Sequence, residues 1–531
     1  MTWDWMRNVR SCGPLLVAGL LAGTAASADP QGPWYWPWPG PQRPNQDVYQ
    51  ALTVKYAKHR ICRTLVQGVC KEWDEVKLRS YNGRLVGPTI EVRPGSTLRI
   101  MLENQLPPDA QPDPHDPNVP HGFNTTNLHT HGLHVSPAGN SDNVLMSVRP
   151  GRTFEYEIKI PKDHPAGTYW YHPHKHGAVA IQVANGLSGA LIVRGDIDEV
   201  PAIRAARERV LVFQQIPYAL TNDPYEPGKQ ALMVEDFSMF APGRWEQSGR
   251  RTTINGEVEP TFKLRPGEVQ RWRLIHAGVR ETLRLKLVRE SDPGSVLAHY
   301  QIAHDGITTG RLDRVDETEM YPGYRTDVLV KAGNRAETYL LLDEESPDGT
   351  GLLGETESRK VLARVVVEGR SVEGRGGSMP LPDEATLARL APFEPIEDHE
   401  LTGTQEARFE VDVRFNPPKF LINGKEYDPH APPRRLELGA VEEWFVSSSR
   451  FSGHPFHIHV NPFQVMTNDG KVLWKDTLFV RPETSVRVRT RYRRYIGQFV
   501  LHCHTLDHED LGMMEKLEIV PPGQGHGHGH P

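Results

Sequence analysis

The chain has 531 residues and a formal net charge of −6, so it lacks the basic surface that nucleic-acid-binding proteins use. Roughly 500 residues remain after a leader is removed, and this length implies two to four domains, because single domains usually hold about 100 to 200 residues. Proline (45) and glycine (47) are abundant, while few long helix-like patterns occur. This composition predicts many short strands joined by turns in a large all-β protein.

The N-terminal segment has the pattern of a secretory leader. Arg7 and Arg10 precede an apolar run over residues 14–22, and a small-residue Ala-Ser-Ala cleavage site ends at Ala28. The run is too short to span a bilayer as a stable helix, and no other apolar stretch approaches that length. Because the two arginines are not adjacent, Sec export is expected rather than twin-arginine export. We therefore expect a periplasmic or secreted protein, cleaved after Ala28, with no stable membrane insertion.

Two cysteines, Cys62 and Cys70, belong neither to the leader nor to the motif around Cys503 described below. In an oxidising compartment they most simply form a disulfide that closes a short loop. The alternative is a pair of free buried thiols. No further ligand cluster lies nearby in the sequence, which argues against a metal site at these cysteines.

One turn-containing stretch occurs three times in the chain. Around its first copy, residues 81–104 alternate apolar and polar positions between Gly and Pro turns, as half-buried strands do. Equivalent turns, spaced 173 and 168 residues apart, are predicted at Asn82-Gly83, Asn255-Gly256 and Asn423-Gly424. Self-similarity at this spacing favours three related β-sandwich domains over a solenoid, whose repeats are far shorter.

Charged, poorly periodic stretches indicate the domain boundaries. The first domain is expected over residues 29–200 and the second over residues 205–370. A linker over residues 371–400 leads to the third domain at 401–521, and a His/Gly tail follows at 522–531. The second domain contains no His-x-His pair, so its expected role is spacing and architecture. The tail has the composition to capture copper loosely, but a disordered or neutral tail fits it equally well.

Histidine pairs are far more frequent than chance allows. With 24 histidines in 531 residues, on the order of one His-x-His pair is expected by chance, and the chain has seven. Residues i and i+2 of a strand share one face, so each pair in a strand presents two imidazoles together. Four pairs lie in strand-like surroundings: His129 and His131, His172 and His174, His457 and His459, and His502 and His504.

The last pair encloses a cysteine, which places two kinds of ligand on one strand end. Cys503 is expected on the face opposite to its two histidine neighbours. His508 and Met513 follow in a predicted loop, and His454 stands apart from the nearby pair. A cysteine, two histidines and a weak axial methionine form the blue-copper ligand set.

Together these segments resemble the four copper motifs of the multicopper oxidases, and the ending HEDLGMM is similar to the bacterial laccase and bilirubin-oxidase-like branch. YPGYRTDVLV, which begins at Tyr321, is a further similarity. The resemblance implies three consecutive cupredoxin-like Greek-key β-sandwich domains and four copper ions. It implies type 1 copper on His454, Cys503, His508 and Met513, type 2 copper on His129 and His457, and a type 3 pair on His131, His172, His174, His459, His502 and His504.

This ligand order implies a function. Ligands from the first and third domains must converge, so the trinuclear cluster is expected at their interface. The resemblance implies an oxidase that couples four one-electron oxidations at the type 1 copper to reduction of dioxygen to water, with His508 as the point of electron entry. Phenols or aromatic amines are the expected donors, as for laccases, and we expect a monomer.

Two alternatives remain open. The first is a metallo-oxidase for cuprous, ferrous or manganous ions in metal tolerance. The 11 methionines are scattered and the predicted linker holds only Met379, whereas such enzymes often carry a methionine-rich insertion. The second is a non-catalytic copper-binding envelope protein.

Acids close to the motifs are candidates for moving protons to the cluster. Glu509 and Asp510 follow the predicted ligand His508 directly, and Asp142 lies downstream of His131. The resemblance implies such a role for Glu509 and Asp142. The alternative is that these are solvated surface carboxylates. His134 and His176, which follow predicted ligands closely, are expected to form hydrogen bonds or turns rather than to bind metal.

Overall fold

The computed structural model describes residues 47–66, 68–241, 243–346, 358–372, 377–467 and 470–525. The predicted leader, over residues 1–28, and residues 526–531 of the tail lie outside the described residues. Strands dominate the rest, and the longest described helix, α1 (Val179–Ala184), has 6 residues. The remaining described helices are α2 (Asp196–Glu199), α3 (Pro201–Ala205), η1 (Phe237–Phe240), α4 (Glu384–Ala388), η3 (Asp398–Glu400) and α5 (Leu506–Asp510). The prediction of an all-β protein is confirmed.

The first sandwich packs two sheets around one apolar core. One sheet has the order β10-β11-β2-β1-β4-β6 and the other the order β3-β8-β7-β5. Strand β4 buries every second side chain, whereas β7 and β8 are buried along their whole length, because they lie inside the molecule. The strands are β1 (Val48–Val66), β2 (Val69–Tyr81), β3 (Ile90–Val92), β4 (Thr97–Asn104), β5 (His129–His131), β6 (Thr153–Lys159), β7 (Gly167–His172), β8 (Gly189–Val193), β10 (Ala219–Asn222) and β11 (Gln230–Met233).

The second sandwich follows in sequence. Its sheets have the orders β12-β9-β14-β20-β17-β18 and β13-β22-β21-β15-β16, and β19 pairs with β15. The strands are β9 (Arg207–Ile216), β12 (Arg251–Ile254), β13 (Thr261–Leu264), β14 (Val269–His276), β15 (Leu283–Arg289), β16 (Asp292–Val296), β17 (His299–His304), β18 (Ile307–Val315), β19 (Glu317–Met320), β20 (Arg325–Lys331), β21 (Glu337–Asp343) and β22 (Lys360–Val367).

The third sandwich carries the C-terminal motifs. Its sheets have the orders β24-β23-β26-β31-β28-β29 and β25-β33-β32-β27-β30. The strands are β23 (Gly403–Asp412), β24 (Lys419–Ile422), β25 (Arg434–Glu437), β26 (Val441–Ser448), β27 (His454–Ile458), β28 (Phe463–Met466), β29 (Val472–Lys475), β30 (Thr477–Val480), β31 (Ser485–Arg491), β32 (Gly497–Cys503) and β33 (Met514–Val520).

All three sandwiches repeat one strand pattern. The first strand of each runs parallel to a later strand of its own sheet, as β1 does with β4, β9 with β14, and β23 with β26. The second sheet of each has a parallel pair at one edge, formed by β3 and β8, β13 and β22, and β25 and β33. The chain therefore has the predicted architecture of three consecutive cupredoxin-like sandwiches, while the residue boundaries proposed between them stay a prediction.

Each repeated Asn-Gly turn is hydrogen-bonded to the first strand of its sandwich. At each turn both residues have positive φ, between 51° and 84°, which is the conformation for which Asn-Gly is favoured in tight hairpins. Each asparagine Oδ1 also accepts a backbone N–H from the first strand of its sandwich, at 2.7 Å from Thr53, 2.9 Å from Val212 and 2.8 Å from Arg408. The prediction of three equivalent turns at Asn82, Asn255 and Asn423 is confirmed.

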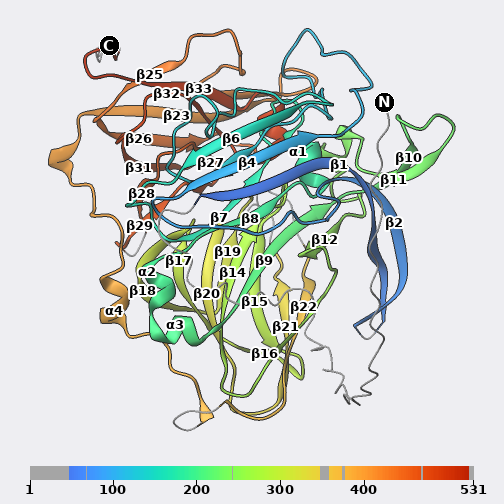
Figure 1. The fold of residues 1–531 in the computed structure, drawn as a ribbon, viewed down its shortest axis with the longest axis vertical. Helices are drawn as coiled ribbons and strands as arrows, with labels where there is room; N and C mark the ends of the chain where they lie inside the picture. The colour runs from blue at the N-terminus through green and yellow to red at the C-terminus, as the bar shows by residue number, and fades with distance from the viewer. Residues whose placement is uncertain are drawn as a thin grey trace, which may run out of the picture.

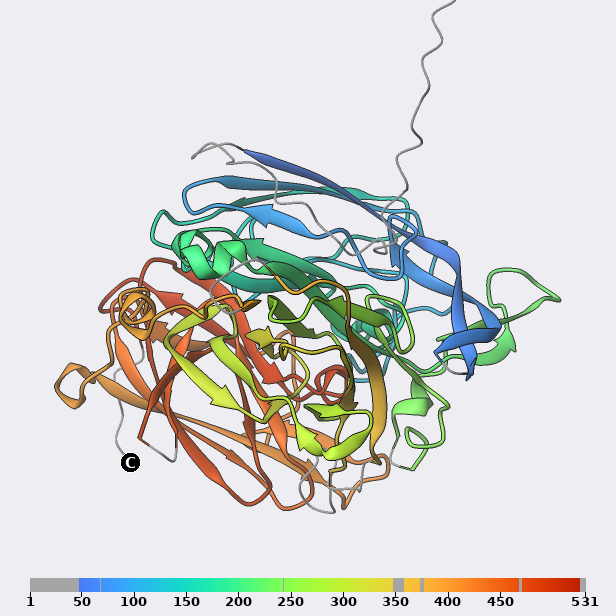
Figure 2. The ribbon, with the colours of Figure 1, turned by 90° about the horizontal axis from the view of Figure 1, so that it is seen from below.

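The three sandwiches lie against one another. In Figure 1 the second sandwich (green to yellow) lies below the other two, and Figure 2 shows the first (blue to cyan) and third (orange to red) on either side of it. Strand β7 contacts β14 and β20 of the second sandwich, α1 contacts α5, and β29 contacts β17 and β18. Because α1 follows the first histidine motifs and α5 carries His508, these contacts bring the predicted ligand segments together.

A long hairpin of β1 and β2 extends from the first sandwich and is visible at the right of Figure 1. Cys62 and Cys70 form a disulfide near its tip. The predicted pairing is confirmed, and the alternative of two free thiols is excluded.

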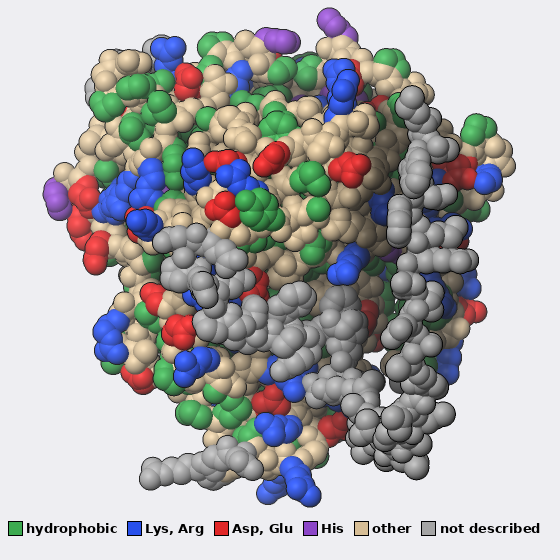
Figure 3. Space-filling model, in the orientation of Figure 1, with side chains coloured by type: hydrophobic (Ala, Val, Ile, Leu, Met, Phe, Trp, Pro, Cys, Tyr) green, Lys and Arg blue, Asp and Glu red, His purple; other side chains and the backbone are tan. Residues whose placement is uncertain are grey.

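Neither sign of charge dominates the face of the molecule that Figure 3 shows. On the face in Figure 3, Lys and Arg side chains are interspersed with Asp and Glu. Within the described ranges, no helix is long and apolar enough to cross a bilayer.

Candidate metal centres

Strand pairing aligns the four histidine motifs in two groups. In the first sandwich β5 runs antiparallel to β7, which sets His129 opposite His172. In the third, β27 runs antiparallel to β32, which sets His457 opposite His502. Rings from the two groups stack across the interface, with centroids 4.0 Å apart for His129 and His459. The interface between the first and third sandwiches therefore holds one cluster of eight histidines.

Ring nitrogens in this histidine cluster approach closely. The Nε2 atom of His502 lies 3.2 Å from Nε2 of His174 and 3.3 Å from Nε2 of His459. On the other side, His131 Nδ1 lies 3.4 Å from His172 Nε2. Burial lowers the pKa of His131, His172, His174 and His459, to about 4 for His174, so their lone pairs are available for a cation.

Buried histidine ring nitrogens that have no hydrogen-bond partner indicate whether a metal ion fits this cluster. Within the described chain, Nε2 of His129, Nε2 of His457, Nδ1 of His459 and both ring nitrogens of His504 are buried without a hydrogen-bond partner. Buried polar atoms left in this state are costly, and imidazole nitrogens are ligands for copper. Three ligand atoms lie within 4.8 Å of one another in several combinations, among them His174, His459 and His502. The cluster therefore fits bound copper.

A second group lies within the third sandwich. Cys503 Sγ lies 3.4 Å from Nδ1 of His454 and 3.8 Å from Nδ1 of His508, and the two nitrogens are 3.4 Å apart. Burial raises the pKa of the Cys503 thiol, so a bound cation is needed to hold it as a thiolate. Met513 is fully buried, and its backbone bonds to both Cys503 and His508. His454, Cys503 and His508 thus meet in one buried site, and the backbone of the predicted fourth ligand, Met513, is bonded to two of them.

One predicted local structure was wrong. His508 lies in the short helix α5 and not in a loop. Five residues are too few for a helical period to appear in the sequence. The Asp510 carboxylate accepts the backbone N–H groups of Val179 and Ala180, at 3.1 and 2.8 Å, so it joins α5 to the start of α1 rather than facing the histidines.

Both predicted acids are buried beside the histidine cluster. Asp142 lies 3.0 Å from Nδ1 of His129. Burial raises the pKa of Asp142 to about 7, although hydrogen bonds from Thr130 lower it. Glu509 is fully buried, with its carboxylate oxygens 3.3 Å from His174 Nδ1 and 3.0 Å from His502 Nδ1. The alternative of solvated surface carboxylates does not fit either residue.

Sequence reasoning missed a second layer of residues around the cluster. Asp476 groups with His131 and His457 within 4.8 Å, and Arg325 of the second sandwich pairs with Asp476. Neither residue stands in a histidine motif, and only the YPGYRTDVLV similarity included Arg325. His134 and His176, which were not expected to bind metal, face Val460 O and Asn118 Oδ1.

Comparison with known proteins adds independent findings. Two protein-family models, each described as multicopper oxidase, match this chain, one over residues 119–197 and the other over residues 392–523. A multicopper oxidase of Staphylococcus aureus is 25% identical over 461 residues, covering 83% of both chains. A laccase of Bacillus subtilis is 23% identical, covering 91% of this chain and 96% of the relative.

Solved structures share the fold. A Campylobacter jejuni multicopper oxidase, described as a metallo-oxidase, has a TM-score of 0.65 at 24% identity and covers 90% of this chain and 96% of its own. The multicopper oxidase McoA of Aquifex aeolicus has a TM-score of 0.66 at 21% identity, and the match covers 90% of this chain and 99% of McoA. The two matched regions contain all the predicted copper ligands, and the chain therefore contains multicopper oxidase domains, which are the domains of a family of oxidoreductases.

Proposed function

We propose that the protein is a laccase-like oxidase that takes single electrons from phenols or aromatic amines and reduces dioxygen to water. Copper, when bound, would supply one-electron chemistry at the Cys503 site and reduction of dioxygen at the histidine cluster. The proposed ligands are His454, Cys503, His508 and Met513 for type 1 copper, His129 and His457 for type 2, and His131, His172, His174, His459, His502 and His504 for the type 3 pair.

The observation that carries this proposal is the position of Cys503 between the two sites. Its side chain faces His454 and His508, while the flanking His502 and His504 belong to the histidine cluster. The Cys503 carbonyl also accepts a hydrogen bond from His502 Nδ1 at 3.0 Å. A covalent path and a hydrogen bond thus connect one site to the other.

The surrounding acids orient the rings. The Glu509 carboxylate faces Nδ1 of His174 at 3.3 Å and Nδ1 of His502 at 3.0 Å, and the Nε2 atoms of these two rings lie 3.2 Å apart on the other side. Asp142 does the same for His129 by holding its Nδ1. A hydrogen-bond partner of the ring nitrogen that does not bind the metal fixes both the tautomer and the orientation of a ligand histidine.

A cavity beside His508 supports an aromatic donor. Its volume is about 680 Å³, and Phe237, Phe240, Phe420 and Phe451 line it. The ring of Phe420 lies 4.5 Å from that of His508, centroid to centroid. Inside the described ranges, no group of three metal-binding side chains forms at this cavity beyond the Cys503 site itself. The four aromatic side chains favour a ring-shaped donor, although Asp236, Glu246 and Asp507 also line the cavity.

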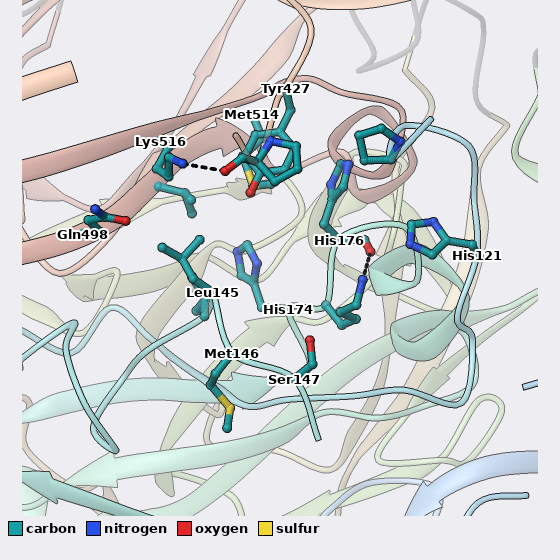
Figure 4. Close-up of a pocket in the computed structure, with 15 residues that line it drawn as sticks. His121, Leu145, Met146, Ser147, His174, His176, Tyr427, Gln498, Met514 and Lys516 are labelled. Carbon is teal, nitrogen blue, oxygen red and sulfur yellow. Dashed lines mark hydrogen bonds between the residues drawn. The ribbon is translucent and has the colours of Figure 1, made fainter. Parts of the chain in front are cut away.

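A second cavity, of about 420 Å³, reaches His174 and offers a route for dioxygen. Figure 4 shows the His174 ring between Leu145 and His176, with Met514 and Tyr427 on the opposite wall. Since His174 belongs to the histidine cluster, a small apolar molecule in this cavity lies next to the proposed site of reduction.

Asp507 is expected to bind the hydrogen-bonding group of the donor. The residue is buried in the wall of the cavity beside His508; its Oδ1 has no partner among the described residues, and Oδ2 lies 3.4 Å from Arg280. Asp507→Asn should raise KM for a phenol by about tenfold, because a hydrogen bond to a charged group contributes about 1.5 kcal/mol. Steady-state oxygen uptake measures this.

Ferrocyanide, which has no O–H or N–H group, is the matched control donor. Its KM should not rise in Asp507→Asn, because this donor loses no hydrogen bond and meets less negative charge in the variant. An equal rise in KM for both donors would mean that Asp507 shapes the site rather than binding the phenol.

An absorption spectrum of the copper-loaded protein, followed by oxygen uptake with a phenol and then with Cu(I), tests the proposed function. An intense visible Cu–thiolate band and phenol-driven uptake support it. The same band with uptake only on cuprous, ferrous or manganous ions would indicate a metallo-oxidase. Full copper loading with no uptake on any donor would indicate a copper-binding envelope protein, and full loading without the band would exclude Cys503 as ligand.

We also propose that the protein is exported and monomeric. The support is the leader pattern that ends at Ala28 and the mixed surface charge. A mature N-terminus at Asp29 is the expected result of N-terminal sequencing, and an intact Met1 would contradict export by cleavage.

A further inference from the structure

A buried ion pair joins the second sandwich to the histidine cluster. Arg325, at the start of β20, donates to Asp476 in two hydrogen bonds, Nη1 to Oδ1 at 2.8 Å and Nη2 to Oδ2 at 2.5 Å. The Arg325 side chain has no exposed surface and that of Asp476 is 5% exposed. Such a two-point pair fixes the plane and position of the carboxylate.

Asp476, in the third sandwich, in turn contacts one histidine of the first sandwich and one of the third. Its Oδ1 lies 3.1 Å from Nε2 of His131, and its backbone carbonyl accepts a hydrogen bond from Nδ1 of His457 at 2.7 Å. The hydroxyl of Thr477 donates to Asp476 Oδ1 at 2.8 Å and lies 3.2 Å from each of the same two ring nitrogens. The two rings stack with centroids 4.0 Å apart.

These contacts decide which ring nitrogen carries the proton. A neutral imidazole has one N–H, and the nitrogen that faces a carboxylate or carbonyl keeps it. That leaves Nδ1 of His131, which points at His172, and Nε2 of His457, which has no hydrogen-bond partner among the described residues, as lone pairs for copper. The ligand proposed for type 2 copper and one proposed for type 3 copper are thus set by the same residue, His457 through the backbone carbonyl of Asp476 and His131 through its carboxylate.

The surroundings hold this pair in one place. Arg325 also donates to the backbone carbonyls of Gly323 and Asp305, at 2.8 and 2.9 Å. Gly132, which follows His131, has a φ of +89°, and a Cβ there would overlap both Arg325 Nη2 and Asp476 Oδ2. Backbone of the first and second sandwiches therefore packs closely around the pair.

We infer that Arg325 and Asp476 are positioning residues, which hold His131 and His457 in the orientation and tautomer that copper binding requires. The second sandwich, although it provides none of the proposed ligands, then controls metal retention at the interface of the other two. This inference rests on the proposed copper cluster. Mutation of a residue that orients a ligand histidine typically lowers metal affinity or activity by about 10- to 100-fold.

Asp476→Asn and Arg325→Lys test the inference. Both should lose copper from the histidine cluster in dialysis against a chelator, with about 10- to 100-fold weaker retention, and the type 2 signal in electron paramagnetic resonance should vanish or shift. The blue band should remain, because neither residue touches His454, Cys503 or His508. Asp476→Ala should lose more copper than Asp476→Asn, since asparagine keeps one acceptor oxygen for His131.

Arg271→Lys is the matched control. Arg271 is also buried and pairs with Asp198 and Asp327, at 2.7 and 2.6 Å, and none of its ion pairs in the described structure involves a histidine. It should keep both copper signals, and circular dichroism of the copper-free variants checks their fold. Unchanged copper content and an unchanged type 2 signal in Asp476→Asn would overturn the inference, as would a loss of the blue band in step with the cluster. A wild-type protein that takes up no copper would instead overturn the proposed function itself.

Discussion

Replacement of Cys503 by serine is expected to remove the intense visible band of the copper-loaded protein and to reduce phenol-driven oxygen uptake to background. The sulfur lies between the two imidazoles of the site and accepts the backbone N–H of Thr505 at 3.4 Å. A serine hydroxyl has nearly the same shape, so the core should persist. It lacks the soft, polarisable sulfur that gives a Cu–thiolate bond its absorption and its coupling to neighbouring groups. Absorption spectroscopy and oxygen uptake check both expectations.

The disulfide provides the control for this experiment. Cys503 is the one free cysteine in the described part of the chain, and Cys62 and Cys70 are bonded to each other at the hairpin. The double variant Cys62→Ser/Cys70→Ser should keep the band and the activity. If Cys503→Ser retained the band, the sulfur of Cys503 would not be the ligand responsible for it.

Glu509→Gln is expected to slow turnover by about 10²- to 10⁴-fold, the range in which positioned acids and bases contribute, while copper remains bound. Glutamine has the shape of glutamate and still accepts one hydrogen bond, but it cannot hold and release a proton. Glu509 lies within 3.3 Å of two cluster histidines and has no exposed surface, so bulk water cannot replace it. The turnover number at saturating dioxygen, with copper content measured on the same sample, checks this.

Asp142→Asn is the companion variant. Asp142 contacts a single histidine, His129, and is also held by the backbone N–H of Thr130 at 2.8 Å. We expect a smaller loss of turnover, about tenfold, with copper content intact. Unchanged turnover in Asp142→Asn would remove this residue from the mechanism, and loss of copper in Glu509→Gln would make Glu509 a positioning residue instead of a proton carrier.

Local patterns in the sequence predicted the architecture well. Asn82, Asn255 and Asn423 were recognisable because a tight hairpin with two positive-φ residues favours Asn-Gly wherever it occurs. The candidate ligands were recognisable for a similar reason, since a strand brings residues two apart onto one face. Both signals lie within a few residues of the feature that they predict.

The residues that support the ligands gave no such signal. Arg325 and Asp476 are 151 residues apart, and nothing in either local sequence indicates that they meet. A lone arginine or aspartate is usually a solvated surface residue, and only the packing of three sandwiches buries this pair. The role predicted for the second sandwich was spacing and architecture, and the structure adds that its Arg325 pairs with Asp476, which contacts the cluster.

The first and second sandwiches share a sheet. The β10–β11 hairpin belongs to the second sandwich in sequence, yet Leu232 of β11 pairs with Val76 of β2 in the first. Beneath it, one apolar core combines Ile61, Trp245 and Leu506, which come from all three sandwiches. The chain emerging at synthesis thus cannot complete its first sheet until residue 233 has been made, nor this core until residue 506. Folding to the final state therefore waits for nearly the whole polypeptide.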